Sequence, residues 1–568
     1  MKLSYGVFHE GYKIAGPIKP AKDIQNAPKS IRLTMGRNDF MPFTVLLSAD
    51  AGYSVQLGPY AWFTERGDVP TVRLSIDFPL PVKVFHEQTH IDHRSQIAYA
   101  DALLPADVKE YNYGQIAGVC YIIQTDKNTA PGAYTGKIRL YTCCGTEDEV
   151  LAGEIDVCLD VLDVTLRSGQ ENRFYLDLWQ HPCNIARHAD VRLFSDEHFA
   201  VLEQYLRSLS ALGQRALTLI VSEGPWGGQM CWEHPESGNN VYEFSIIPVT
   251  KRRDGSFHYD FSIMQRYIDL GKKCGIRDEL SVYGLINIWP RYDYIWLLRG
   301  EAVAPRVRYL DETTGCYAFM QTQQELDNYV RAIEQYFITT GQINRVRIAA
   351  DEPADVEIFR KSLNHLHEVA PAFTFKAAIN HVEFIDEFGE HFSDFVPFLE
   401  CARDKLKQLQ EYKRKMPGKR LLWYTCLGPD RPNYFLSSEL LESYLVGILT
   451  SVYGLDGYLR WSYTVWTKDP MNSVAYNHYS AGDMYIVYPG ANGKPILSLR
   501  YYALKRGIQF YELLRSYQSR YGRRRMMELV APLFTVKDVQ KFDTSFSTSY
   551  ADYENLRNKL LKALENRK

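Results

Sequence analysis

Apolar and polar residues alternate in short runs over roughly the first 165 residues of the chain. Clear examples are residues 30–34, 43–47, 71–76 and 137–141, and Gly, Pro, Asn and Asp separate such runs. A period of two predicts strands with one buried face. Many short strands at this spacing favour a β-sandwich, which we expect to span residues 1–168 and to end in a polar linker.

From residue 173 the pattern changes, because strand-like runs now alternate with segments whose apolar residues recur every three or four positions. Such alternation predicts parallel strands connected by helices. Eight strand–helix units over about 340 residues predict a (β/α)8 TIM-type barrel across residues 169–520. Residues 521–568 are predicted to form a helical C-terminal extension. The strand-like runs are 173–178, 216–221, 280–286, 344–352, 373–379, 395–399, 420–426 and 457–463.

The totals agree with a multidomain globular protein. A chain of 568 residues is too long for one core and suggests two or three domains. The net charge of −3 gives no electrostatic footprint for nucleic acid or for an anionic membrane, so neither is expected as a partner. No run approaches the ~18 apolar residues that a membrane span needs.

The cysteines and the N-terminal residues indicate the cellular compartment of the protein. The ten cysteines are scattered without a CxxC pair, which indicates reduced thiols. The given N-terminus has no apolar segment of the kind found in signal peptides. We therefore expect a cytoplasmic protein.

Two adjacent acids, Asp351 and Glu352, end the fourth predicted barrel strand. Val346, Ile348 and Ala350 before them alternate as in a half-buried strand, and the proline that follows suits the first turn of a helix. The C-terminal end of a barrel strand is where this fold places its chemistry. The alternative is that both acids only cap the following helix, whose N-terminus favours negative charge.

The segment from His86 to His90 matches the H-E-x-x-H pattern of zinc peptidases. That pattern needs a helix, whereas Pro79, Pro81 and the alternation after them predict a strand. Along a strand, two histidines four residues apart lie about 13 Å from each other and cannot share one ion. We therefore predict no metal site.

Several blocks of the chain carry a resemblance to a known family. Together with a β-sandwich followed by a barrel whose fourth strand ends in Asp-Glu-Pro, they resemble glycoside hydrolase family 123 over nearly the whole chain. One departure is the stretch from Lys505 to Phe510, where the family usually has acidic residues after Gly-Ile. The blocks are residues 175–179, 226–228, 422–426, 453–461, 466–470, 482–490 and 498–500.

The resemblance implies a retaining, exo-acting β-N-acetylgalactosaminidase that uses substrate-assisted catalysis, with a glycan or glycoconjugate as substrate. It implies that Glu352 is the general acid/base and that Asp351 orients the 2-acetamido group as its carbonyl attacks C1. Such chemistry needs one acid with a raised pKa beside a carboxylate that stays ionised, and it requires no cofactor. Two alternatives remain open: a glycosidase of the same fold with another sugar specificity, and a non-catalytic carbohydrate-binding protein.

Aromatic residues make up 13% of the chain, and many follow predicted strands, where they could stack on a sugar. Polar residues at strand ends could bind sugar hydroxyls. The alternative for each is packing inside the barrel or, for the histidine, a structural role. The candidates for substrate binding are Tyr424, Trp461, Tyr463, Trp226, Asn287, Trp289, Asn380 and His381.

Overall fold

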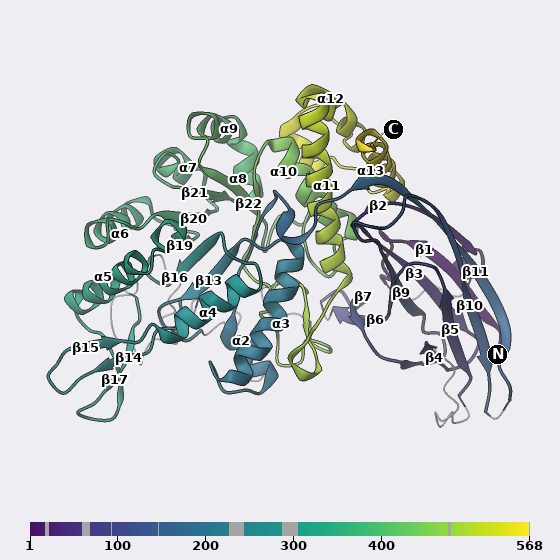
Figure 1. Cartoon of the computed structure of the whole chain (residues 1–568), viewed down its shortest axis with the longest axis horizontal. Coiled ribbons are helices and arrows are strands. Elements are labelled where there is room, and N and C mark those ends of the chain that lie inside the picture. Colours follow the sequence, from purple (N-terminus) through teal and green to yellow (C-terminus); the bar gives the residue numbers. More distant parts are fainter. Residues whose placement is uncertain are drawn as a thin grey trace.

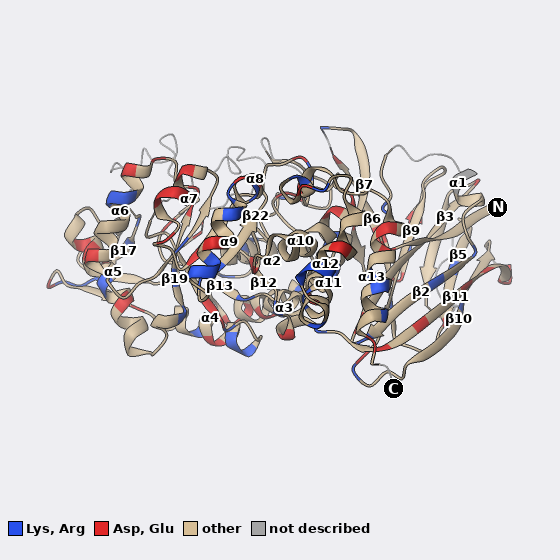
Figure 2. Ribbon diagram, turned by 90° about the horizontal axis from the view of Figure 1, so that it is seen from above, with Lys and Arg blue, Asp and Glu red and all other residues tan. Residues whose placement is uncertain are grey.

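The computed structural model in Figure 1 has a sheet-rich N-terminal part beside a larger part in which strands are surrounded by helices. Figure 2 shows acidic and basic residues mixed along the ribbon of both parts. Within the described residues, no helix is long and apolar enough to cross a membrane. The structure describes residues 1–16, 22–58, 69–92, 94–145, 147–226, 243–286, 305–474 and 479–566.

The N-terminal part contains two sheets of five and six strands. The five-stranded sheet is antiparallel throughout, in the order β1 (Leu3–His9), β3 (Phe40–Ala49), β9 (Ala117–Gln124), β6 (Val82–Asp92) and β7 (Ile97–Leu104). The six-stranded sheet has the order β2 (Ser30–Arg37), β11 (Val150–Thr165), β10 (Gly132–Cys143), β5 (Thr71–Asp77), β4 (Tyr53–Leu57) and β8 (Val108–Tyr111).

One apolar core joins these two sheets. Phe43 and Val45 of β3 lie in the same buried cluster as Ile138 and Leu140 of β10. The alternation seen in the sequence is thus the alternation between this core and the other face of each sheet. The strand predicted for residues 86–90 is confirmed, since these residues belong to β6.

Eight parallel strands form one sheet in the second part, and around this sheet they follow chain order. The first two strands meet through a bridge between Leu176 and Gln214, so the barrel is nearly closed. The predicted eight-stranded parallel barrel is therefore confirmed. The strands are β12 (Tyr175–Leu178), β13 (Ala216–Ile220), β16 (Glu279–Tyr283), β19 (Val346–Asp351), β20 (Phe375–Ile379), β21 (Asp394–Pro397), β22 (Arg420–Tyr424) and β23 (Gly457–Arg460).

A helix follows each barrel strand and covers the outside of the sheet (Figure 1). The sequence signals act as expected: Ser195 caps the first of these helices by accepting a hydrogen bond from the His198 backbone. The helices are α3 (Asp196–Leu212), α4 (Ser262–Lys273), α5 (Gln323–Thr339), α6 (Val356–Val369), α7 (Val382–Phe388), α8 (Leu399–Asp404) with α9 (Leu406–Lys415), α10 (Leu440–Tyr453) and α11 (Leu499–Tyr521).

Two glycines set the close packing of α10 on α11. A Cβ atom on Gly447 would lie 1.7 Å from the carbonyl oxygen of Gly507, and one on Gly507 would lie 2.2 Å from the Ser443 carbonyl oxygen. The two helix backbones therefore touch, which no larger residue at either position permits.

The barrel interior contains a layer of charged side chains. Asp177, Glu279, Lys376 and Arg420 come from the first, third, fifth and seventh strands, as expected for one layer of a closed barrel. The Lys376 ammonium pairs with Asp177 and lies 2.8 Å from Glu279, and Arg420 lies 3.1 Å from Glu279. Mutual pairing makes the burial of these charges tolerable.

The C-terminal helices connect the two parts of the molecule. Helix α13 (Tyr550–Leu564) carries Arg557, which donates hydrogen bonds to the Thr34 carbonyl at 2.6 Å and to Asp39 at 2.5 Å. Both acceptors belong to the N-terminal sheets or their connection. The extension predicted as helical is helical, and it lies against both the sheets and the barrel (Figure 1).

The remaining strands and α-helices are mostly short and lie in the segments that connect the main elements. A small sheet of β14 (Val249–Lys251), β15 (Phe257–Tyr259), β17 (Arg308–Asp311) and β18 (Tyr317–Phe319) projects beside α4 and α5 (Figure 1), and the sequence pattern did not predict it. The others are α1 (Lys22–Gln25), α2 (Pro182–Ala189), β24 (Tyr488–Pro489), β25 (Pro495–Ile496) and α12 (Arg523–Val530).

Candidate active site

Asp351 and Glu352 lie at the C-terminal edge of the barrel, where β19 ends. Asp351 is buried, and the Glu352 backbone N–H still bonds the Ala378 carbonyl of β20 at 3.0 Å. Glu352 has a φ of 43°, a left-handed conformation that is uncommon for a residue other than glycine. Successive side chains of a strand point to opposite faces, and this turn interrupts that alternation at the second acid.

Tyr424 holds the Glu352 carboxyl group. Its hydroxyl donates a hydrogen bond of 2.5 Å to Oε1 of Glu352. The Tyr424 side chain is buried and packs edge-on against Phe398, with ring centroids 5.4 Å apart. Since Tyr424 ends β22, on another side of the barrel, the Glu352 side chain must point across the mouth.

The environment of Glu352 favours its protonated form. Burial raises the pKa of this carboxyl above its usual value, and the negative charge of Asp483 raises it further. The hydrogen bond from Tyr424 and the proximity of His381 act in the opposite direction without cancelling the rise. A half-buried glutamic acid with a raised pKa stays protonated to a higher pH than an exposed one. It can therefore act as a general acid.

Aromatic rings line the same edge of the barrel. Trp226 packs on Trp179 and on Tyr283, with ring centroids 5.6 and 5.0 Å apart, and on His181 at 4.9 Å. Tyr283 ends β16, the strand beside β19, and its pKa is raised by burial and, to a smaller extent, by nearby negative charges that include Asp351. Trp226 thus lies in an aromatic cluster next to the strand that carries the two acids.

Trp461 extends this cluster toward the eighth strand. Its ring lies 6.3 Å from His181 in an edge-on arrangement and 5.2 Å from Tyr479. Burial lowers the pKa of His181 to about 3, so its ring is neutral at neutral pH. Of the predicted substrate-binding residues, the structure therefore brings Tyr424, Trp461 and Trp226 to the edge where Glu352 lies.

The other candidates lie differently. Tyr463 is buried, and its hydroxyl is 2.8 Å from Ser208 on α3, so its contacts are with the outer helices rather than with Glu352. Asn380 and His381 are exposed where β20 ends, and His381 is near enough to influence the Glu352 pKa. Asn287 and Trp289 lie outside the described residues.

An ion pair beside Glu352 was not among the predicted site residues. Arg460, the last residue of β23, pairs with Asp483, and both side chains are fully buried. Arg460 also donates to the Thr425 hydroxyl and to the Asn433 side chain, each at 3.1 Å. An arginine within an apolar strand signals a buried acid partner, but only the fold shows that the partner is Asp483.

The H-E-x-x-H segment does not form a metal centre in the described part of the chain. There, no group of three or more His, Cys, Asp or Glu side chains is arranged to hold an ion. Glu87 accepts a 2.6 Å hydrogen bond from the Thr44 hydroxyl, and the His90 ring stacks on Tyr488 with centroids 4.7 Å apart. These residues pack within the sheets and against the barrel part.

A nearly closed eight-stranded barrel, with two carboxylates ending its fourth strand beside aromatic rings, is the arrangement of a barrel glycoside hydrolase. The model of the glycoside hydrolase 123 catalytic domain matches residues 179–517. The chain belongs to glycoside hydrolase family 123.

Structural comparison agrees with this assignment. A family 123 glycoside hydrolase from Clostridium perfringens superimposes with a TM-score of 0.76 at 18% identity, covering 99% of this chain and 97% of that one. A glycoside hydrolase structure from Bacteroides vulgatus reaches a TM-score of only 0.30 at 10% identity over 81% of this chain and 76% of that one, too little to inform on the site. No curated protein matches the chain in sequence.

Proposed function

We propose that this glycoside hydrolase removes terminal β-linked N-acetylgalactosamine with retention of configuration, by substrate-assisted catalysis. The observation that carries the proposal is the backbone turn at Glu352, with its φ of 43°. Such strain is concentrated at functional sites. Here it frees Glu352 from the strand alternation, so that two adjacent acids can serve one sugar.

In the first step, protonated Glu352 gives its proton to the leaving glycosidic oxygen. The carbonyl oxygen of the substrate's own 2-acetamido group attacks C1 as the bond to the aglycone breaks, which forms an oxazolinium ion. Asp351, as a carboxylate, accepts the acetamido N–H and stabilises the positive charge that develops there. The raised pKa of Glu352 supports its role as the acid.

In the second step, the Glu352 carboxylate takes a proton from water. The resulting hydroxide attacks C1 on the face that the aglycone left, the oxazolinium ring opens, and the sugar leaves with its original configuration. Tyr424 supports this step, because its hydroxyl donates to Oε1 and so stabilises the carboxylate while the proton is away.

The proposed sugar specificity and the proposed class of natural glycan are inferred from the resemblance to the family. The Clostridium perfringens enzyme was described in connection with glycolipid glycan hydrolysis, which supports a glycan or glycoconjugate as the substrate class. Trp226 and Trp461 are only 1% and 6% exposed, so they support the proposal as part of an aromatic wall behind the site rather than as open faces that stack on a sugar. The alternatives are another sugar specificity on the same fold, or carbohydrate binding without turnover.

The test is an assay of wild type, Glu352→Gln and Asp351→Asn on aryl N-acetyl-β-galactosaminide and N-acetyl-β-glucosaminide. We expect turnover of the galacto substrate, reduced roughly 10²–10⁴-fold by loss of the acid/base. An oxazoline mimic should inhibit only a substrate-assisted enzyme. Turnover of neither substrate by folded wild type would favour a different glycan or a binding protein, and turnover without such inhibition would favour a two-carboxylate mechanism.

We further propose that the chain consists of three structural units, of which the barrel carries the catalytic site. Residues 1–168 form a β-sandwich domain, residues 169–520 the catalytic barrel and residues 521–568 a helical extension. The apolar core shared by the two N-terminal sheets supports the first of these. A cytoplasmic location is supported by the cysteines of the described residues, all of which are free thiols.

A further inference from the structure

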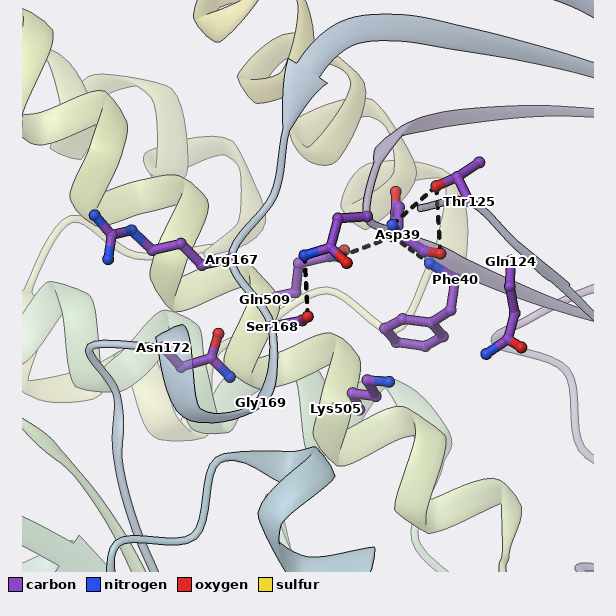
Figure 3. A pocket seen from close by; sticks show the side chains of 11 residues that line it. Asp39, Phe40, Gln124, Thr125, Arg167, Ser168, Gly169, Asn172, Lys505 and Gln509 are labelled. Atoms are coloured by element: carbon purple, nitrogen blue, oxygen red, sulfur yellow. Dashed lines mark hydrogen bonds between the residues drawn. The ribbon is translucent and has the colours of Figure 1, made fainter. Parts of the chain in front are cut away.

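A cavity lies between the N-terminal sheets and the barrel (Figure 3), and Glu352 is not among the residues that line it. Its volume is about 100 Å³, enough for a few water molecules or one small oxyanion. Four segments surround it: the start of β3, the end of β9, the linker before the barrel, and α11. The lining residues are Asn38, Asp39, Phe40, Gln124, Thr125, Arg167, Ser168, Gly169, Asn172, Lys505 and Gln509.

Lys505 is the cation of this cavity. Its ammonium lies 4.7 Å from the centre of the Phe40 ring, and Figure 3 shows it beneath that ring. No hydrogen bond or ion pair joins it to another described residue, although the Asp39 carboxylate acts on it electrostatically. Arg167 is turned away from the other lining side chains (Figure 3). An ammonium without an anionic partner, facing a polar cavity, is a ready site for an anion.

The nearby carboxylate does not neutralise Lys505, because its oxygens are already taken. Asp39 Oδ1 accepts from the Gln509 amide at 2.8 Å, and Oδ2 accepts from the Gly36 backbone at 3.0 Å and from Arg557 at 2.5 Å. Arg506 lies 3.4 Å from Oδ1 as well. The remaining hydrogen-bonding capacity of Asp39 toward Lys505 is therefore small.

The charges around the cavity leave a positive excess. Arg506 also pairs with Glu10 at 2.9 Å, so two carboxylates face two arginines, and Lys505 adds a third cation. Gln509 stands next to this group as a neutral side chain, in the stretch where the family usually has acidic residues. Burial lowers the pKa of Lys505 to about 8, which still leaves it mostly charged at pH 7.

We propose that this cavity binds a small oxyanion, of which phosphate and sulfate are the simplest. The Lys505 ammonium donates a hydrogen bond to a charged oxygen of the ligand. Because residues of both the sheets and the barrel line the cavity, a bound oxyanion stabilises the folded arrangement of the two parts.

Binding is tested on the full-length protein by calorimetric titration at pH 7 with inorganic phosphate, and with sulfate and chloride at equal ionic strength. Phosphate and sulfate should each bind at one site and raise the melting temperature, and chloride, which is a single atom with one charge, should bind far more weakly. Equal weak effects of all three anions would overturn the proposal, since that is general screening.

Variants identify the site. Lys505→Met should weaken phosphate binding about tenfold or more, as expected for a lost charged hydrogen bond. Lys127→Met removes a surface lysine that pairs with Glu171, and should leave binding unchanged. Unchanged binding in Lys505→Met would overturn the assignment; if that variant does not fold, the wild-type comparison of phosphate and sulfate with chloride decides.

Discussion

The Tyr424 hydroxyl donates a 2.5 Å hydrogen bond to Oε1 of Glu352, although two other strands separate β22 from β19 in the barrel wall. The contact crosses the mouth of the barrel. It fixes one oxygen of the proposed acid/base and leaves the other available to a substrate. The position of the proton on Glu352 is thus set partly by a residue 72 positions away in sequence.

Removing the Tyr424 hydroxyl should shift the pH dependence of kcat/KM to higher pH. The hydrogen bond from Tyr424 lowers the Glu352 pKa, so Tyr424→Phe should raise it. Glu352 acts protonated in the first step, and activity is therefore lost as pH rises through its pKa. The alkaline limb of kcat/KM should move to higher pH, and activity should fall roughly tenfold or more. Tyr463→Phe, which removes a hydroxyl bonded to Ser208 instead, should leave the limb in place.

Neutralising Asp483 should shift the alkaline limb of kcat/KM to lower pH. Its negative charge raises the Glu352 pKa, so Asp483→Asn should lower it and move the alkaline limb to lower pH. The change also leaves Arg460 buried without its partner, at a cost of about 3–5 kcal/mol in stability.

A matched control separates these two effects of the Asp483 substitution. Asp101→Asn removes the partner of another buried arginine, Arg500, and should destabilise similarly without moving the limb. The pH profile of kcat/KM and the melting temperature are the measurements. An alkaline limb that stays fixed in Asp483→Asn, or moves equally in both variants, would contradict the electrostatic role of Asp483.

Glu87→Gln should stabilise the protein at neutral pH. Burial raises the Glu87 pKa to about 7, so at pH 7 this acid is only about half ionised in the fold, while it is fully ionised in the unfolded chain. Its contribution to stability is present below the unfolded pKa of about 4.5 and is lost as pH rises toward 7. Glutamine should recover up to about 3 kcal/mol at pH 7.

Denaturant unfolding at pH 4.5 and pH 7 measures this effect, with exposed Glu110→Gln as the control that should change little. Activity of Glu87→Gln on the glycoside substrate should remain. Stoichiometric zinc in the wild type, together with loss of activity when a chelator is added, would instead revive the peptidase interpretation of this segment.

Gly447→Ala should destabilise the barrel. The added methyl group would meet the Gly507 carbonyl oxygen at 1.7 Å, so α10 and α11 would have to separate. Overpacking of this kind costs about 1–3 kcal/mol, and direct contact with backbone favours the upper end. Gly418→Ala, with nothing within 4 Å of its new Cβ, serves as the control in thermal unfolding. Equal melting temperatures for the two variants would show that the helices can separate at little cost.

Local patterns predicted the strands and helices well, because each barrel strand is a short apolar run and each outer helix has an apolar face. The positions and contacts of individual side chains were harder to predict from the sequence. Tyr463 was predicted to face a sugar, but β23 ends at Arg460, and beyond it the alternation no longer fixes direction. Its hydroxyl instead reaches Ser208 on α3.

Charged pairs inside the barrel illustrate what the sequence could not show. Asp177, Glu279 and Lys376 each appear as a single charge in an otherwise apolar strand, separated by about a hundred residues from one another. Their pairing depends on closure of the barrel, which brings alternate strands into one layer. Asp483 was missed for the same reason, since its partner Arg460 is set by tertiary packing alone.

Helix α13 also has a consequence for biosynthesis. A ribosome delivers the N-terminal sheets first and the barrel next, and only afterwards the helix whose Arg557 bonds Asp39 and Thr34. Until that helix emerges, Asp39 has only one of its two arginines, and the joint between the sheets and the barrel is incomplete. The contacts that join the sheets to the barrel through Arg557 therefore form only after α13 has been synthesised.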